Sequence, residues 1–159
     1  DAAVELYKRL SPEQRQKTFL YWHTAYPDLG WDIPLYLKKN GLGSKVLFSY
    51  VCQNCRLFQP SFYKDVRAVC PRCKSANLTL PNTQVGLQRE ELGAVVGLFD
   101  AYVQYATNDG FGIPLVEAAF CGDAIFANDY SAMSDILTKL NGYRIKTTLF
   151  HECETGRKL

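Results

Sequence analysis

Four of the six cysteines form two Cys-x-x-Cys pairs, Cys52 with Cys55 and Cys70 with Cys73, separated by fourteen residues. A Cys-x-x-Cys turn places two thiolates on one side of a metal ion, and two such turns supply the four sulfur ligands of a structural zinc site. The spacing therefore predicts a zinc ribbon that holds structural Zn²⁺, with two disulfides or unfilled thiols as the alternatives. Because four thiolates leave no open coordination position, we do not expect catalytic zinc.

A second stretch with chemical potential is the glycine-rich run Asp109-Gly110-Phe111-Gly112-Ile113. It follows a strand-like segment and precedes a helix-like one that contains Glu117. Backbone N–H groups at the start of a helix lack intrahelical partners, and the helix dipole adds partial positive charge there. The run therefore predicts a turn that binds a phosphate or a row of sugar hydroxyls, with Asp109 and Glu117 on either side of it.

The elements that must position these residues alternate along the chain. Hydrophobic periodicity and capping residues predict helices over residues 2–10, 33–39, 90–99, 114–120 and 131–140, with a further helix start at Ser11. Apolar or β-branched runs predict strands over 18–24, 45–51, 101–106, 124–127 and 143–150. This alternation predicts an α/β fold, a Rossmann-like parallel sheet with helices on both faces.

The alternation stops between residues 52 and 82, where Pro60, Ser61, Asn77 and Pro81 are expected to form turns. We therefore predict one Rossmann-like domain formed by residues 1–51 and 83–159, with the zinc ribbon inserted as residues 52–82. An insert of about 30 residues is too small for a core of its own, so the metal is expected to fold it.

Composition narrows the function classes. The chain has 159 residues, of which 47% are apolar and 21% charged, and a net charge of +2. This composition is typical of soluble globular proteins, and the charge is too evenly balanced to indicate nucleic-acid binding. The sequence has no apolar run of the ~18 residues that are needed to span a bilayer. The N-terminus does not resemble a signal peptide, and paired cysteines favour a reducing compartment, so we predict a cytoplasmic protein.

The remaining cysteines and both histidines are not predicted to carry chemistry. Cys121 and Cys153 are unpaired by spacing and are expected to be buried, inert thiols. His23 is expected at the end of a strand and His151 in a polar tail, and neither has a second metal ligand at a useful spacing.

The wider sequence around the glycine-rich turn resembles the signature of family 4 glycosyltransferases of the GT-B fold. That signature runs acidic-Gly-Phe-Gly-apolar-Pro-x-x-Glu-Ala-x-x-Cys-Gly, followed by a strand and a turn of small residues. The matching string here is Asp109-Gly110-Phe111-Gly112-Ile113-Pro114-Leu115-Val116-Glu117-Ala118-Ala119-Phe120-Cys121-Gly122. Outside the ribbon, the resemblance covers most of residues 18–136.

The resemblance implies an activity and a role for each matched residue. Such a protein transfers a sugar from a nucleotide-diphosphate sugar with retention of anomeric configuration, and needs no metal for the transfer. Glu117 matches the glutamate that binds the ribose 2′- and 3′-hydroxyls. The turn whose N–H groups face the donor sugar and diphosphate is matched by Gly110, Phe111, Gly112 and Ile113. Asp109 matches the first acid of the Glu-x₇-Glu motif and is the candidate catalytic residue, although it is one methylene shorter.

The resemblance also implies that partners are missing from the sequence. GT-B enzymes place the active site between two Rossmann-like domains, and this chain matches the C-terminal, nucleotide-binding one, with its first strand absent. The N-terminal acceptor domain and the basic pair that neutralises the diphosphate would precede Asp1. We therefore read the chain as a piece of a longer protein that binds donor weakly and shows no transfer by itself.

The ribbon allows a different function. As a non-catalytic α/β module, the chain would bind nucleic acid or protein through basic and aromatic side chains of the insert. These side chains are Arg56, Phe58, Phe62, Tyr63, Lys64, Arg67, Arg72 and Lys74. If the strands over 45–51 and 101–106 belong to one parallel sheet, the ribbon also lies on the same rim as the donor turn, where ligands of open α/β sheets bind.

Overall fold

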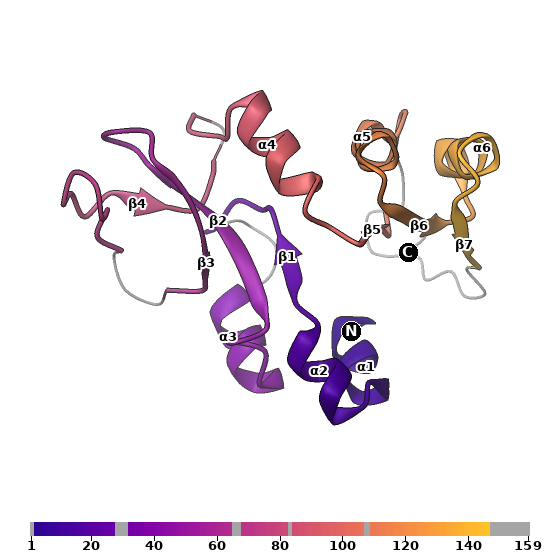
Figure 1. Cartoon of the computed structure of the whole chain (residues 1–159), viewed down its shortest axis with the longest axis horizontal. Helices are drawn as coiled ribbons and strands as arrows, with labels where there is room; N and C mark the ends of the chain where they lie inside the picture. Colours follow the sequence, from indigo (N-terminus) through magenta and orange to yellow (C-terminus); the bar gives the residue numbers. More distant parts are fainter. Residues whose placement is uncertain (1, 28–31, 65–67, 83, 107–108, 147–159) are drawn as a thin grey trace, which may run out of the picture. The chain divides into compact units, whose positions relative to one another are not determined.

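The computed structural model describes residues 2–27, 32–64, 68–82, 84–106 and 109–146 (Figure 1). The chain divides into two compact units, Asp1–Gln88 and Arg89–Leu159. Among the described residues, none of the helices has both the length and the apolar character needed to cross a membrane.

The first unit combines three helices with four strands (Figure 1). Its helices are α1 (Ala2–Arg9), α2 (Pro12–Lys17) and α3 (Ile33–Asn40). Its strands are β1 (Leu20–Trp22), β2 (Val46–Cys52), β3 (Phe58–Phe62) and β4 (Leu78–Thr79). The predicted helices and the two predicted strands of this part of the chain are confirmed, with shorter bounds for β1.

Local sequence explains where these helices begin and end. Ser11 and Gln14 form a complete capping box at the start of α2. The Asp32 carboxylate accepts a hydrogen bond from the Leu35 N–H at 3.0 Å and so caps α3. Gly41 ends α3 in the left-handed region, with φ 64°, where glycine carries no Cβ penalty.

Strand β2 is the centre of a mixed sheet. It pairs in parallel with β1 and antiparallel with both β3 and β4. Val51 pairs with Phe58 of β3 and with Thr79 of β4, so β3 and β4 lie along opposite edges of β2. The expectation of a purely parallel sheet is therefore wrong for this unit, because strands from the four-cysteine segment extend the sheet instead of forming a separate insert.

The turn predicted at Pro60 and Ser61 is also wrong, since both residues lie within β3. Pro60 pairs with Ser49, and β3 is the outer strand in the order β1-β2-β3. An edge strand tolerates proline because only one side of it needs backbone donors for the sheet. Pro60 therefore indicates an edge strand, and does not indicate that a strand is absent.

The core of the first unit lies between β2 and helices α1 and α3. Alternate residues of β2, among them Phe48 and Cys52, belong to it, together with Tyr7 of α1 and Leu37 of α3. Phe48 is completely buried and packs edge-on against Trp22, with ring centroids 5.8 Å apart. Burying an aromatic or leucine side chain of this kind contributes about 1.5–3 kcal/mol, so this cluster holds the helices on the sheet.

The second unit is a three-stranded parallel sheet in the order β5-β6-β7. Its strands are β5 (Ala101–Gln104), β6 (Ala124–Asn128) and β7 (Tyr143–Ile145), and its helices are α4 (Arg89–Val96), α5 (Ile113–Cys121) and α6 (Ser131–Lys139). These elements agree with the prediction, except that residues 147–150 of the last predicted strand lie outside the described residues.

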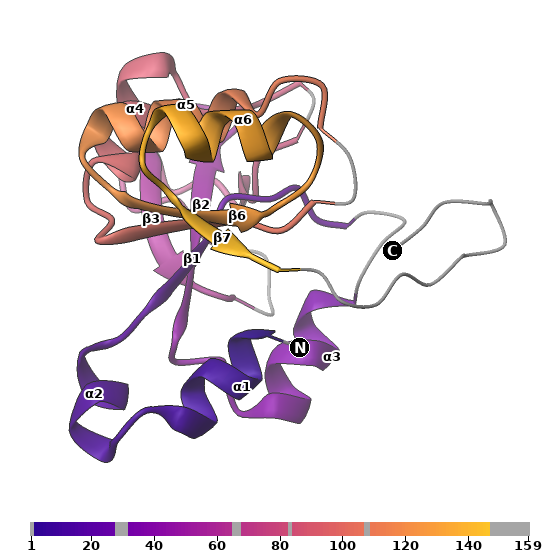
Figure 2. The same cartoon turned by 90° about the vertical axis from the view of Figure 1, so that its right-hand side faces the viewer.

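Helices α5 and α6 lie side by side on one face of this sheet, as Figure 2 shows. Right-handed β-α-β connections that advance in one direction place successive helices on the same face. The core between them contains Leu115 and Ala118 of α5, Ile125 of β6, and Met133 and Leu137 of α6. This unit thus has the parallel β-α-β connections that the sequence predicts, whereas α5 and α6 share one face of the sheet and do not cover both faces as predicted. The chain as a whole is α/β.

Candidate metal centre and glycine-rich turn

The four predicted metal ligands come together in the first unit. The Sγ atoms of Cys52, Cys55, Cys70 and Cys73 all lie within 4.8 Å of one another. Cys52 Sγ is 3.6 Å from Cys73 Sγ, and Cys55 Sγ is 3.6 Å from Cys70 Sγ. Four sulfurs about 2.3 Å from a tetrahedral ion are roughly 3.8 Å apart, whereas a disulfide needs about 2.05 Å. The cysteines are free thiols placed to hold a metal ion, and the disulfide alternative is not what the structure has.

Both Cys-x-x-Cys turns have the same backbone geometry. The Arg56 N–H donates to the Cys52 carbonyl and the Lys74 N–H donates to the Cys70 carbonyl, each at 2.9 Å. Arg56 and Lys74 both have positive φ, 58° and 60°, which is uncommon outside glycine. Each strained residue follows the second cysteine of its turn. The positive φ of this residue is therefore part of the turn that directs both thiols toward one point.

The environments of the thiols differ. The Ser75 hydroxyl lies 3.1 Å from Cys73 Sγ and 3.5 Å from Cys52 Sγ. Hydrogen bonds from the Ser75 hydroxyl, the Ser75 N–H and the Asn54 side chain lower the pKa of Cys73 to about 5. At Cys55 a hydrogen bond from the Leu57 N–H lowers the pKa, but burial and the three other thiols together raise the pKa to about 11. The two half-buried cysteines therefore have pKa values shifted in opposite directions, and a cation that binds must displace the protons that remain on the ligands.

The metal centre joins elements on both edges of β2. Cys52 is the last residue of β2, and Cys55 lies in the turn that leads to β3. Cys70 and Cys73 precede β4, whose segment is tied back by a bond from the Gln53 N–H to the Asn77 carbonyl at 3.0 Å. A bound ion would therefore connect the two antiparallel partners of β2 at one end of the sheet.

The basic and aromatic residues of this segment differ in exposure. Arg56, Arg72 and Lys74 are exposed, whereas Phe58 and Lys64 are half-buried. Tyr63 packs against Phe48 and the apolar core. Phe62 is 39% exposed, and Arg67 lies outside the described residues.

In the second unit, Asp109 organises the glycine-rich turn. Its Oδ1 accepts hydrogen bonds from the N–H groups of Phe111 and Gly112, at 3.0 and 2.6 Å. Its Oδ2 accepts a bond from Gln104 Nε2 at 2.7 Å. The N–H groups of Gly112 and Phe111 hold the pKa of Asp109 below its usual value, so the turn contains a fixed negative charge. These bonds give Asp109 a positioning role in the turn.

Gly112 is required for the shape of this turn. Its φ is 77°, and a Cβ on it would lie 3.0 Å from Ile136 Cδ1 in the core. It accepts the first helical hydrogen bonds of α5, from the N–H groups of Leu115 and Val116. A close approach of the turn to α6 and a left-handed backbone both exclude larger residues here.

The other predicted donor-binding residues lie on the surface around this turn. Phe111 is 63% and Ile113 58% exposed, and Gly110 and Glu117 are exposed as well. Burial raises the pKa of Tyr102 first, and the negative charges of Glu117 and Asp109 raise it further, so both acids act on one phenol. Tyr102 and Gln104 were missed by the sequence interpretation. Tyr102 and Gln104 alternate with exposed Ala101 and Val103 along β5, and this arrangement becomes visible only in the structure.

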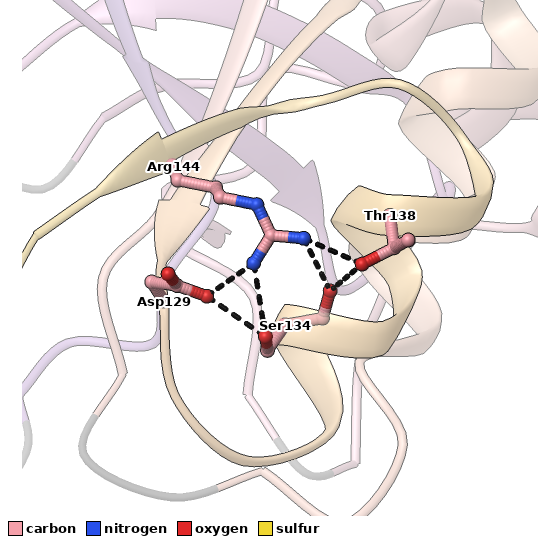
Figure 3. A network of polar contacts seen from close by, with 4 residues as sticks. All are labelled: Asp129, Ser134, Thr138 and Arg144. Atoms are coloured by element: carbon pink, nitrogen blue, oxygen red, sulfur yellow. Dashed lines mark hydrogen bonds and ion pairs between the residues drawn. The ribbon is translucent and has the colours of Figure 1, made fainter.

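Asp129, at the end of β6, is the centre of a second polar network (Figure 3). Its carboxylate accepts hydrogen bonds from Ser134 Oγ at 2.8 Å and from the Arg144 guanidinium. Arg144 also donates to Ser134 and to Thr138 Oγ1 (Figure 3). Ser134, then Arg144, hold the pKa of Asp129 below its usual value. The network connects the ends of β6 and β7 to α6, and nothing in the sequence pattern had indicated it.

Two minor expectations have clear outcomes. Cys121 is exposed, not buried, because it occupies the solvent side of the last turn of α5, so that prediction is wrong. His23 is exposed and its Nδ1 lies 2.8 Å from the buried Ser49 hydroxyl, with no role in the metal centre. Cys153 and His151 lie outside the described residues.

Comparison with family models, with curated proteins and with solved structures finds no match for this chain. The resemblance to family 4 glycosyltransferases therefore stays a prediction from the residues quoted above. The ribbon and the donor turn were expected to lie on the same rim of one sheet. They belong to different units, so this expectation also stays a prediction.

Proposed function

We propose that the second unit is the donor-binding part of a retaining glycosyltransferase that uses a nucleotide-diphosphate sugar. The observation that supports this proposal is the strand–turn–helix from β5 to α5, in which a left-handed Gly112 and the Asp109 carboxylate hold the turn. Glu117 is exposed on the first half of α5, one helical turn after Ile113. Ligands of parallel α/β sheets bind at this end of the strands.

In this proposal the two acids have different tasks. Glu117 accepts two hydrogen bonds from the vicinal ribose hydroxyls, for which a carboxylate has suitable geometry. Asp109 uses its oxygens to fix the turn, and so acts on the donor mainly through the position of the turn. The N–H groups at the start of α5 and the exposed Phe111 then face the sugar and diphosphate, where positive backbone dipoles stabilise the leaving group.

A ligand screen tests this function. UDP-, GDP- and ADP-glucose are added to the chain, and binding is followed by thermal shift and saturation-transfer NMR. We expect one nucleotide sugar to bind, and Glu117→Ala to abolish its binding. Glu90→Ala on α4 is the matched control, because Glu90 is also an exposed helical acid of this unit. Donor binding that survives Glu117→Ala would contradict the assignment.

For the four-cysteine site we propose structural Zn²⁺. Two sulfur–sulfur distances are 3.6 Å and all lie within 4.8 Å, close to the separations in a tetrahedral site. Four protein ligands would fill that site, which suits a metal that stabilises the fold. Elemental analysis of purified protein is expected to give one zinc per chain. Iron or a substoichiometric metal content would contradict this identity.

A second candidate function is nucleic-acid binding by the first unit, and the distribution of charge favours it. Residues 1–88 contain twelve basic and six acidic side chains, whereas residues 89–159 contain six and ten. Arg56, Arg72 and Lys74 are exposed around the metal centre. We expect single-stranded RNA to bind with an affinity that falls steeply with salt if this function holds. Arg72→Ala with Lys74→Ala is then compared with Lys38→Ala with Lys39→Ala on α3, and equal losses would refute a site at the metal centre.

A further inference from the structure

The shortest sulfur contacts in the metal centre link the two Cys-x-x-Cys turns to each other. Both 3.6 Å contacts, Cys52–Cys73 and Cys55–Cys70, join one cysteine of the first turn to one of the second. In each pair one residue is completely buried, Cys52 or Cys70, and its partner is half-buried. Each contact therefore joins a cysteine that is partly exposed to solvent to one that is completely buried.

We propose that this centre is also an oxidative modification site, at which a hydroperoxide converts Cys52–Cys73 and Cys55–Cys70 into two disulfides and the metal ion is lost. Each sulfur pair has to shorten by only about 1.6 Å to reach disulfide length. The inference does not depend on glycosyl transfer. Its outcome can be measured on thiols and metal without any nucleotide sugar.

The chemistry is balanced with a peroxide as oxidant. The reachable thiol, Cys73 or Cys55, attacks one peroxide oxygen, forms a sulfenic acid and releases one water from hydrogen peroxide. The buried partner, Cys52 or Cys70, then attacks that sulfenic sulfur, forms the disulfide and releases a second water. Each disulfide uses one peroxide, which takes two electrons from the two sulfurs. Free thiols supply the two protons of the waters; where the sulfurs are metal-bound thiolates, solvent supplies these protons and the two metal–sulfur bonds break. Two peroxides thus remove all four ligands from the ion.

The pairing has a structural consequence. A metal ion and the two cross-turn disulfides connect the same two turns, so either one joins the β2–β3 hairpin to the segment that precedes β4. Disulfides within each turn, Cys52–Cys55 and Cys70–Cys73, would leave the two turns unconnected. We therefore expect a folded reduced form with metal, a folded oxidised form without metal, and loss of the β3 and β4 pairings only in the reduced, metal-free protein.

The experiment uses the zinc-loaded full chain with Cys121→Ser and Cys153→Ser, so that only the four ligands can react. Hydrogen peroxide is added in steps, zinc release is followed with a chromogenic chelator, and disulfides are mapped by mass spectrometry after proteolysis in acid. We expect zinc release with two peroxides per chain, formation of Cys52–Cys73 and Cys55–Cys70, and recovery of zinc binding after reduction with dithiothreitol.

Pairs within each turn, links between chains, or retention of zinc at two equivalents of peroxide would overturn the proposal. The variant Cys70→Ser keeps the proposal testable if mapping is incomplete, because it retains three ligands. It leaves one cross-turn contact, Cys52–Cys73 at 3.6 Å, and one pair within a turn that shares Cys52, Cys52–Cys55. We expect peroxide to join Cys52 mainly to Cys73, and a majority of Cys52–Cys55 would refute the geometric preference. Hydrogen exchange of the β3 amides is then measured in the oxidised protein that has all four ligand cysteines. Protected amides indicate a folded oxidised form, and fast exchange indicates an unfolded one.

Discussion

The two units hold their sheets in different ways. In the first unit, Cys52 and Cys70 belong both to the metal centre and to the buried core, so ligand geometry and apolar packing act through the same residues. In the second unit, the core is formed by α5, α6 and the sheet, with glycines at the points of closest approach. The difference is that one unit brings four potential metal ligands together at its core, whereas the other relies on steric fit for its final shape.

Metal removal should produce the largest difference in stability between the two units. Structural zinc contributes roughly 10–16 kcal/mol of apparent binding free energy in small zinc domains, so its loss exceeds the stability of most domains. We expect chelation under reducing conditions to expose the amides of β3 and β4 to hydrogen exchange, while β5, β6 and β7 keep their protection. Mass spectrometry of exchanged peptides measures this. Equal loss of protection in both sheets would contradict the comparison.

A methyl group at Gly142 should affect only the second unit. A Cβ there would lie 2.4 Å from Leu137 Cδ2 and 2.7 Å from Ile125 Cγ1, and both side chains are buried and cannot move freely. Overpacking of this kind costs about 1–3 kcal/mol, so Gly142→Ala should lower the free energy of unfolding by about that amount. Chemical denaturation measures it, with Gly110→Ala as control, because a Cβ on Gly110 meets no atom within 4 Å. Similar costs for both variants would remove the steric argument.

Removal of the Ser75 hydroxyl should weaken the metal centre without changing its ligands. The hydroxyl lies within hydrogen-bonding distance of Cys73 and Cys52, and such partners of metal ligands are typically worth tenfold or more in affinity. We expect Ser75→Ala to lower zinc affinity about tenfold in competition with a chelator. Ser44→Ala is a control outside the centre. Unchanged affinity in Ser75→Ala would show that the hydroxyl does not support the thiolates.

Two aspartates of the second unit should give small pH effects of opposite sign. Burial, then the charge of Asp100, raises the pKa of Asp123, so its ionised form disfavours folding and stability falls as pH rises through that pKa. The pKa of Asp129 is lowered, so its contribution is present above 3.8 and is lost as pH falls through the lowered value. Near neutral pH, Asp123→Asn should raise and Asp129→Asn should lower the denaturation midpoint. Shifts of the same sign would contradict this.

The sequence predicted most elements because their signals are local. Helix ends are identified by Ser11 with Gln14, Asp32, Gly41 and Gly122, through bonds to residues three or four positions away. The four ligands were predictable for the same reason, since a Cys-x-x-Cys turn is a local geometry. Strand β2 was predicted from its continuous apolar run, which is also a local signal.

What the sequence could not predict depends on pairing across the chain. The mixed sheet arises because Phe58 and Thr79 pair with opposite edges of Val51, and neither pairing leaves a signal in its own segment. The Asp129–Arg144 network joins residues fifteen positions apart, and the bond from Gln104 to Asp109 depends on the turn between them. Side-chain roles of this kind follow from tertiary geometry and are therefore found only with a structure.

Pro60 has a further consequence for behaviour in solution. A strand at the edge of a sheet offers unpaired backbone groups to any other chain, and this is a common route to aggregation. Proline in the middle of β3 interrupts that row, because it has no N–H to offer. The edge strand between the two Cys-x-x-Cys turns is therefore a poor template for pairing with a second chain.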